Sequence, residues 1–179
     1  MLSSGTKLIF YKSISNNYMQ FITEADFNEV LAKDKYYQNR WGYFKQVIDM
    51  IGDFEGRVLE IGVHKLPIFK DSETMDIVKN YEGLTYQRDA TILPYHFEDK
   101  EFDLLVSLQC LEHLHPHQKA VFEEWSRIAK VIVISLPYMW HCPDDIMHHH
   151  IDLPLIEEWT GKKPTMSIIK DCRVILKYE

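Results

Sequence analysis

Residues 57–62 read RVLEIG, a short apolar run that ends in an acid and a glycine. Two later runs have the same character: residues 102–108 read FDLLVSL, and residues 131–137 read VIVISLP. Nearly continuous apolar runs that are rich in β-branched residues and bounded by turn residues are typical of strands buried on both faces of a parallel sheet. Residues 112–130 lie between the last two runs and carry apolar side chains at helical spacing. A strand, a helix and a strand in this order predict a right-handed parallel unit, and therefore an α/β fold.

The neighbouring segments extend this sheet. Residues 74–76 and 84–88 predict two shorter strands. The tail predicts two more, at residues 165–169 and 173–178, which form an antiparallel hairpin most simply placed at the edge of the sheet.

The N-terminal part predicts helical structure. Residues 26–51 predict one helix, with Asp26 as its N-cap and Glu29 as the capping-box partner. Residues 8–11 predict a short strand or a tucked-in arm.

Composition limits the functions that fit. The chain has 179 residues, 46% hydrophobic, and a formal net charge of −7, which indicates one globular domain over residues 1–179. An acidic chain is a poor partner for nucleic acid or for an anionic membrane surface, because both require clustered Lys and Arg. Three widely spaced cysteines and the absence of a long apolar run predict a soluble, cytoplasmic protein.

In an open α/β sheet, ligands bind beyond the carboxyl ends of the strands. An acid after the second strand is placed to accept both ribose hydroxyls, and an acid after the third can accept from the amine of adenine. The chain has neither GxGxxG nor a Walker sequence, so an adenosine ligand without a pyrophosphate fits best, and a nucleotide-binding oxidoreductase is disfavoured. The polar and small residues expected at this edge are Glu60, Gly62, His64, Asp76, Asp89, Ala90, Gln109 and Cys110.

Four short motifs carry a family resemblance. The runs VLEIG at 58–62, DATILPY at 89–95, FDLLV at 102–106 and LEHL at 111–114 resemble, in order and spacing, the class I S-adenosylmethionine-dependent methyltransferases. The resemblance covers roughly half of the chain. The short link between the first two strands is similar to a compact branch found among polysaccharide- and sugar-modifying methyltransferases.

The resemblance implies a Rossmann-like, parallel-rich twisted sheet with helices on both faces and an antiparallel C-terminal edge hairpin. It divides the chain into a helical cover (1–55), a cofactor-binding core (56–137) and an acceptor-side loop with the hairpin (138–179). It also implies S-adenosylmethionine as the cofactor. The implied contacts are Glu60 and Gly62 at its methionine part, Asp76 at the ribose, Asp89 and Ala90 at the adenine, and Leu108 and Gln109 near the sulfonium.

The first loop departs from the family pattern. His64 occupies the position of the family's second glycine, where a side chain would crowd the cofactor unless the loop is re-routed, as Lys65 and Pro67 suggest. Glu73 is the alternative to Asp76 as the ribose ligand if the strand register differs.

The expected reaction is methyl transfer to a small acceptor, with a sugar or sugar nucleotide as the candidate class. A hydroxyl acceptor needs a base near neutral pKa, which favours histidine. The alternative is a non-catalytic methyltransferase-like binding module. No metal site is predicted, and a homodimer through the hairpin edge is left open. The candidate bases are His113, His148, His149 and His150.

Overall fold

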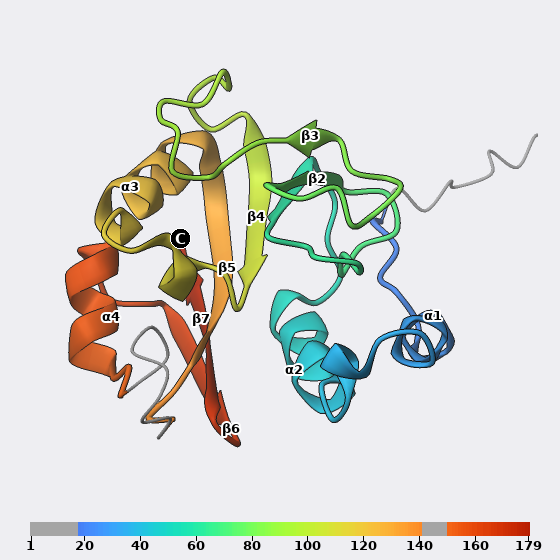
Figure 1. The fold of residues 1–179 in the computed structure, drawn as a ribbon. Coiled ribbons are helices and arrows are strands. Elements are labelled where there is room, and N and C mark those ends of the chain that lie inside the picture. The colour runs from blue at the N-terminus through green and yellow to red at the C-terminus, as the bar shows by residue number, and fades with distance from the viewer. Residues whose placement is uncertain (1–17, 141–149) are drawn as a thin grey trace, which may run out of the picture.

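The computed structural model describes residues 18–140 and 150–179. The predicted N-terminal strand or arm and two candidate bases, His148 and His149, lie outside the described residues. The described chain forms a seven-stranded sheet in the order β3-β2-β1-β4-β5-β7-β6 (Figure 1). The strands are β1 (Val58–Ile61), β2 (Glu73–Asp76), β3 (Tyr86–Gln87), β4 (Phe102–Leu108), β5 (Ala129–Pro137), β6 (Met166–Lys170) and β7 (Arg173–Tyr178).

The pairing confirms the predicted parallel sheet and the antiparallel pair at its edge. Strands β1 to β5 pair in parallel. Strand β7 is antiparallel to both β5 and β6, and β6 forms the outer edge. No helix lies between β1 and β2, in agreement with the short link read from the sequence.

Helices cover both faces of this sheet, as predicted (Figure 1). On one face, α3 (Gln118–Ile128) packs against β5 and α4 (Leu153–Thr160), and Trp125 is fully buried there. On the other face, α1 (Glu24–Leu31) and α2 (Trp41–Ile51) form a second apolar core that includes Val47. Two short 3-10 helices, η1 (Lys35–Tyr37) and η2 (Leu111–Leu114), lie beyond the carboxyl ends of the strands.

The prediction of one helix over residues 26–51 was wrong, because two helices separated by η1 occupy this region. The first begins after Thr23, and Asp26 is the capping partner: its Oδ2 accepts from the Thr23 backbone N–H at 2.7 Å. Asp34 then caps η1 by accepting from the Tyr36 N–H at 2.9 Å. Asn39 has a left-handed φ of 60°, which a continuous helix cannot contain.

Helix α4 was not predicted, and the predicted crossover helix at 112–130 is split into η2 and α3. The sequence does carry end signals for α4. Asp152 accepts from the Leu155 N–H at 2.9 Å, Pro154 lies in the first turn, and Gly161 closes the helix at φ 67°. None of the described helices has the length and apolar character needed to cross a membrane.

Candidate functional site

Three neighbouring cavities lie beyond the carboxyl ends of the parallel strands. The first, which we call the Asp89 cavity, has a volume of about 290 Å³. It unites four of the residues that the resemblance marked, because the ends of β1, β2 and β3 meet at this edge. Its lining includes Gly62, Asp76, Ile77, Asp89, Ala90 and His113.

Asp76 lies at the end of β2 and shapes the first loop. Its Oδ2 accepts from the His64 N–H at 2.9 Å, and its Oδ1 accepts from the Val78 N–H at 3.1 Å. A carboxylate has about four lone-pair sites, so both oxygens can accept further bonds from a ligand. Glu73 lies at the other end of β2, where it pairs with Arg57 at 2.5 Å. The register therefore makes Asp76 the acid at the ligand-binding edge.

Asp89 forms a tight turn after β3. Its Oδ1 accepts from both the backbone N–H and the hydroxyl of Thr91, each at 2.8 Å. These bonds favour the charged form and hold the pKa of Asp89 below its usual range. Within the described chain, no residue donates to Oδ2, so this oxygen is available to a ligand amine. Ala90 is buried beside it, and Ile77 lines the same cavity with 59% of its side chain exposed.

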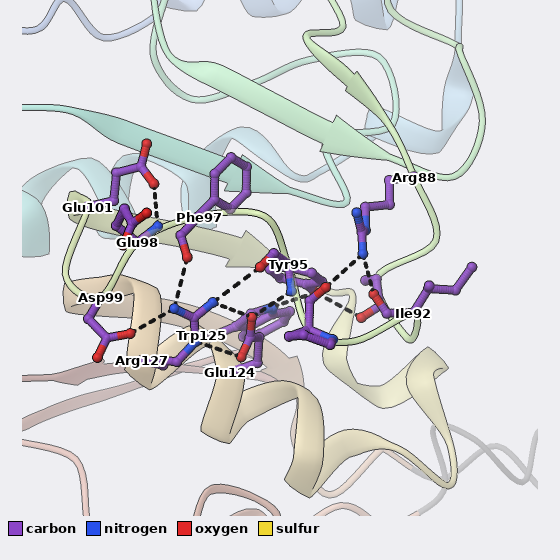
Figure 2. A network of polar contacts seen from close by, with 12 residues as sticks. Arg88, Ile92, Tyr95, Phe97, Glu98, Asp99, Glu101, Glu124, Trp125 and Arg127 are labelled. Atoms are coloured by element: carbon purple, nitrogen blue, oxygen red, sulfur yellow. Dashed lines mark hydrogen bonds and ion pairs between the residues drawn. The ribbon is translucent and has the colours of Figure 1, made fainter.

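A polar network holds the segment that follows Asp89 (Figure 2). Arg127 on α3 donates through Nη1 to the Phe97 carbonyl and to Asp99, both at 2.8 Å. Its Nη2 donates to Glu124 Oε1 at 2.7 Å and to the Tyr95 carbonyl at 3.3 Å. Glu124 Oε1 also accepts from the Tyr95 N–H at 2.7 Å. Helix α3 thus fixes the backbone that presents the Asp89 turn.

Tyr95 connects this network to the cavity. Its hydroxyl donates to the Ala90 carbonyl at 2.8 Å and accepts from Trp125 Nε1 at 3.3 Å. Burial raises the pKa of Tyr95 above its usual range, so the hydroxyl stays protonated and keeps donating.

The second cavity is small, about 30 Å³, and lies beside the first loop. Gly62 lines it with φ 76°, and a Cβ at this position would lie 2.6 Å from Cys110 Sγ. Glycine is required here for two reasons. The backbone has a positive φ, and Cys110, the residue before η2, leaves no room for a Cβ atom. Leu108 and Glu60 line the same cavity.

His64 contacts η1 and its capping residue. Its backbone has φ 52°, its ring centroid lies 5.0 Å from that of Tyr36, and its Nε2 lies 3.4 Å from Asp34 Oδ2. Lys65 Nζ reaches the same Asp34 oxygen at 2.6 Å. The His64 side chain also lines the small cavity beside Gly62.

Glu60 is buried and supports the loop between β1 and β2. Its carboxylate accepts from the Ile68 N–H at 2.6 Å, the Phe69 N–H at 2.8 Å and the Ser72 hydroxyl at 2.6 Å. Burial raises the pKa of Glu60 to about 7, although the three donors favour the charged form. Within the described residues, the Glu60 carboxylate thus accepts three hydrogen bonds from groups of the protein itself.

The third cavity, about 270 Å³, is called the arginine cavity here. Gln109 and His113 line it, and His113 also lines the Asp89 cavity. Trp140 lines it as well. Trp41 is partly buried and packs against the core formed with α1 and α2, with its ring centroid 5.2 Å from that of Phe27.

The described histidines differ in position. His113 lies at the junction of the two larger cavities, whereas His150 is exposed and its N–H donates to the Trp140 carbonyl at 3.2 Å. Across residues 18–140 and 150–179, no group of three or more His, Cys, Asp or Glu side chains is arranged to hold a metal ion.

Several lining residues were missed by sequence reasoning. Ile77 directly follows Asp76, the predicted ribose ligand, so its place in the cavity could have been predicted from the sequence. Glu112 lies within the LEHL motif without an assigned role. Arg40 and Arg173 lie near opposite ends of the described chain, and no spacing in the sequence relates them.

Comparison with known proteins agrees with the resemblance read from the sequence. Residues 68–131 match the family described as Methyltransferase domain. This match and the fold support a class I S-adenosylmethionine-dependent methyltransferase. The match includes the Asp76 and Asp89 positions of this chain, but not Glu60 and Gly62. No curated protein matches its sequence.

Solved structures of methyltransferases share the fold of this chain at low sequence identity. An S-adenosylmethionine-dependent methyltransferase from Aquifex aeolicus is 14% identical with a TM-score of 0.56, covering 85% of this chain and 97% of its own. The Burkholderia thailandensis 1,6-didemethyltoxoflavin-N1-methyltransferase, with S-adenosylhomocysteine bound, is 12% identical with a TM-score of 0.58, covering 86% and 84%. The 16S rRNA methylase RmtB is 13% identical with a TM-score of 0.56, covering 86% and 68%.

Arg127→Met is expected to lower the free energy of unfolding by about 2 kcal/mol, because several charge-assisted hydrogen bonds of a half-buried guanidinium are lost. It is also expected to weaken S-adenosylhomocysteine binding, since the Asp89 turn loses its support from α3. Urea unfolding and calorimetry measure the two effects. Lys119→Met, an exposed change on the same helix, should alter neither quantity; equal effects of the two variants would contradict the role of the network.

Proposed function

We propose that the chain transfers the methyl group of S-adenosylmethionine to a small acceptor. The observation that carries this proposal is the Asp89 cavity, which brings Gly62, Asp76, Asp89 and Ala90 together at one edge of the sheet. Its chemistry fits an adenosine: two carboxylates can accept from ribose hydroxyls and the adenine amine, and Ile77 and Ala90 offer apolar surface to the ring. The family match supports the same cofactor.

The protein's contribution to the reaction is positioning. Bound S-adenosylmethionine supplies an electrophilic methyl group for a direct in-line displacement. Asp76 is proposed to hold the ribose hydroxyls and Asp89 the adenine amine, while Leu108, Gln109, Glu60 and Gly62 border the methionine end. Holding the acceptor in line and excluding water are the main sources of rate enhancement for such a transfer.

The acceptor is proposed to be a sugar or a sugar nucleotide. The net charge of −7 supports a small acceptor over a nucleic acid, whose phosphate backbone needs clustered basic residues. A hydroxyl acceptor requires a base, and His113 is the described candidate that lines both larger cavities. His148, His149 and His150 follow the fifth strand and remain candidates from the sequence.

A non-catalytic binding module is the second candidate. It is favoured by His64 at the position of a family glycine and by the small volume, about 30 Å³, of the cavity beside this loop. In this case the chain would keep the fold and hold a partner or a metabolite without methyl transfer.

Calorimetry with S-adenosylhomocysteine separates the two candidates. We expect micromolar binding that falls about tenfold to hundredfold in Asp89→Ala and in Asp76→Ala, because each change removes hydrogen bonds to a charged acceptor. Asp53→Ala, an exposed change outside the cavities, should bind as the unaltered protein does. Absence of binding at millimolar ligand, with and without candidate acceptors, would favour the binding module.

A further inference from the structure

The arginine cavity is lined by buried polar atoms that lack partners. Both carboxyl oxygens of Glu112, Nη1 of Arg40 and Nε of Arg173 are buried, and none has a hydrogen-bond partner in the described chain. Glu112 is only 1% exposed. Leaving such groups unsatisfied is costly, and native proteins rarely do so without a functional reason or a bound molecule.

Both guanidinium groups are held in place by aromatic rings. The Arg40 guanidinium carbon lies 3.8 Å from the ring centroid of Tyr36, and Arg40 Nε donates to the Tyr36 carbonyl at 2.6 Å. The Arg173 guanidinium carbon lies 4.9 Å from the ring centroid of Tyr43. These contacts position both groups, so their remaining N–H donors can bind an anion such as phosphate or carboxylate.

Glu112 does not neutralise these arginines directly. In the described part of the chain, no ion pair within 4.0 Å joins it to either guanidinium; its nearest basic neighbour is His113, with Nε2 at 4.0 Å from Oε1. Burial raises the pKa of Glu112 to about 8, and Arg40 opposes that rise. The cavity therefore presents two fixed cations and one buried hydrogen-bond acceptor.

The position of the cavity relates it to the acceptor. It shares His113 with the Asp89 cavity and Tyr36 with the small cavity beside Gly62. Arg173 at the start of β7 and Glu112 in η2 line neither of those two cavities. Gln109, which is proposed to border the methionine end of the cofactor, also lines the arginine cavity. The arginine cavity therefore adjoins the proposed cofactor site, whereas Arg173 and Glu112 line the arginine cavity alone.

We propose that the arginine cavity binds the methyl acceptor, and that this acceptor is a small anion that also carries a hydroxyl group. Arg40 and Arg173 hold its phosphate or carboxylate, and Glu112 accepts from its hydroxyl. The inference rests on the proposed methyl transfer and narrows its acceptor class: a sugar phosphate or a sugar acid fits, and a neutral sugar alone does not.

The first experiment uses the full chain saturated with S-adenosylhomocysteine. Saturation-transfer NMR is recorded with glycerol 3-phosphate, glycerate and glycerol as probes. We expect binding of one or both anions and none of glycerol, and the stronger anion distinguishes a phosphate from a carboxylate acceptor. Binding of none of the anions would overturn the inference while leaving methyl transfer intact, whereas failure of S-adenosylhomocysteine itself to bind would count against the proposed function.

The second experiment assigns the binding to this cavity. Arg173→Met is expected to weaken the preferred anion about tenfold or more, and Arg173→Lys, which keeps the charge, should lose less. Glu112→Leu should weaken glycerol 3-phosphate more than it weakens sulfate, which has no hydroxyl to donate. S-adenosylhomocysteine affinity serves as the folding control and should not change. A loss of that affinity would show that the cavity belongs to the cofactor, and unchanged anion binding would place the probes elsewhere; either result overturns the inference.

Discussion

Glu60→Ala is expected to lower the free energy of unfolding by about 3 kcal/mol, measured by urea unfolding at neutral pH. The carboxylate accepts from the backbone N–H groups of Ile68 and Phe69 and from the Ser72 hydroxyl. Ile68 and Phe69 are fully buried, so their donors have no access to water once the carboxylate is removed. The cost is that of unsatisfied buried donors, reduced because a buried carboxylate is removed as well.

Two further variants separate this explanation from general sensitivity to mutation. Glu60→Gln keeps one acceptor oxygen but turns an NH₂ donor toward another donor, so it should fall between the unaltered protein and the alanine variant. Glu55→Ala removes an exposed carboxylate nearby and should change stability by less than about 0.5 kcal/mol. If Glu60→Ala and Glu55→Ala had equal effects, the three bonds would not be what holds the loop.

The strands were the most predictable part of this molecule. Residues 102–108 form β4 with the predicted bounds, and β1 and β5 differ from the predicted runs by one or two residues. These strands are central in the sheet, with both faces covered, and their burial leaves a continuous apolar signal in the sequence. The edge strand β6 was also found, because turn residues separate it from β7.

The helices were less predictable because apolar spacing does not mark where they end. The stripe from Trp41 to Ile51 belongs to α2 alone, and the preceding break depends on the left-handed backbone of Asn39 and the cap at Asp34. Helix α4 has clear end signals, but its short apolar pattern lies in a region that was read as a loop.

Some residues of the candidate site could likewise be predicted from the sequence, and others could not. The acids at the strand ends were predictable, because strand ends follow from the apolar runs and parallel strands share an edge. The register of β2 places Asp76 at this edge and Glu73 at the opposite end of the strand. Arg40, the N-cap of α2, and Arg173, at the start of β7, line one cavity because α2 packs against β7, and no local sequence pattern encodes that packing.

Glu112→Gln is expected to make the protein more stable than the unaltered chain at pH above 8, and the difference should grow by about 4 kcal/mol between pH 4.5 and pH 8. Burial raises the pKa of Glu112 from 4.5 to about 8. Between these values the folded state keeps the proton that the unfolded state releases, so the free energy of unfolding falls as pH rises. Glutamine does not titrate, so the free energy of unfolding of the Glu112→Gln variant does not fall for this reason. Urea unfolding of both proteins from pH 4 to pH 9 measures the difference.

A control variant tests whether this pH dependence is specific to Glu112. Glu158→Gln changes an exposed carboxyl, and its stability difference should stay flat over the same range. Glu60 also contributes to the profile of each protein, but it is common to both and largely cancels in the difference. A difference for Glu112→Gln that does not change with pH would mean that Glu112 ionises in the folded state as it does in water, and its two buried oxygens would then need a donor already present in the protein.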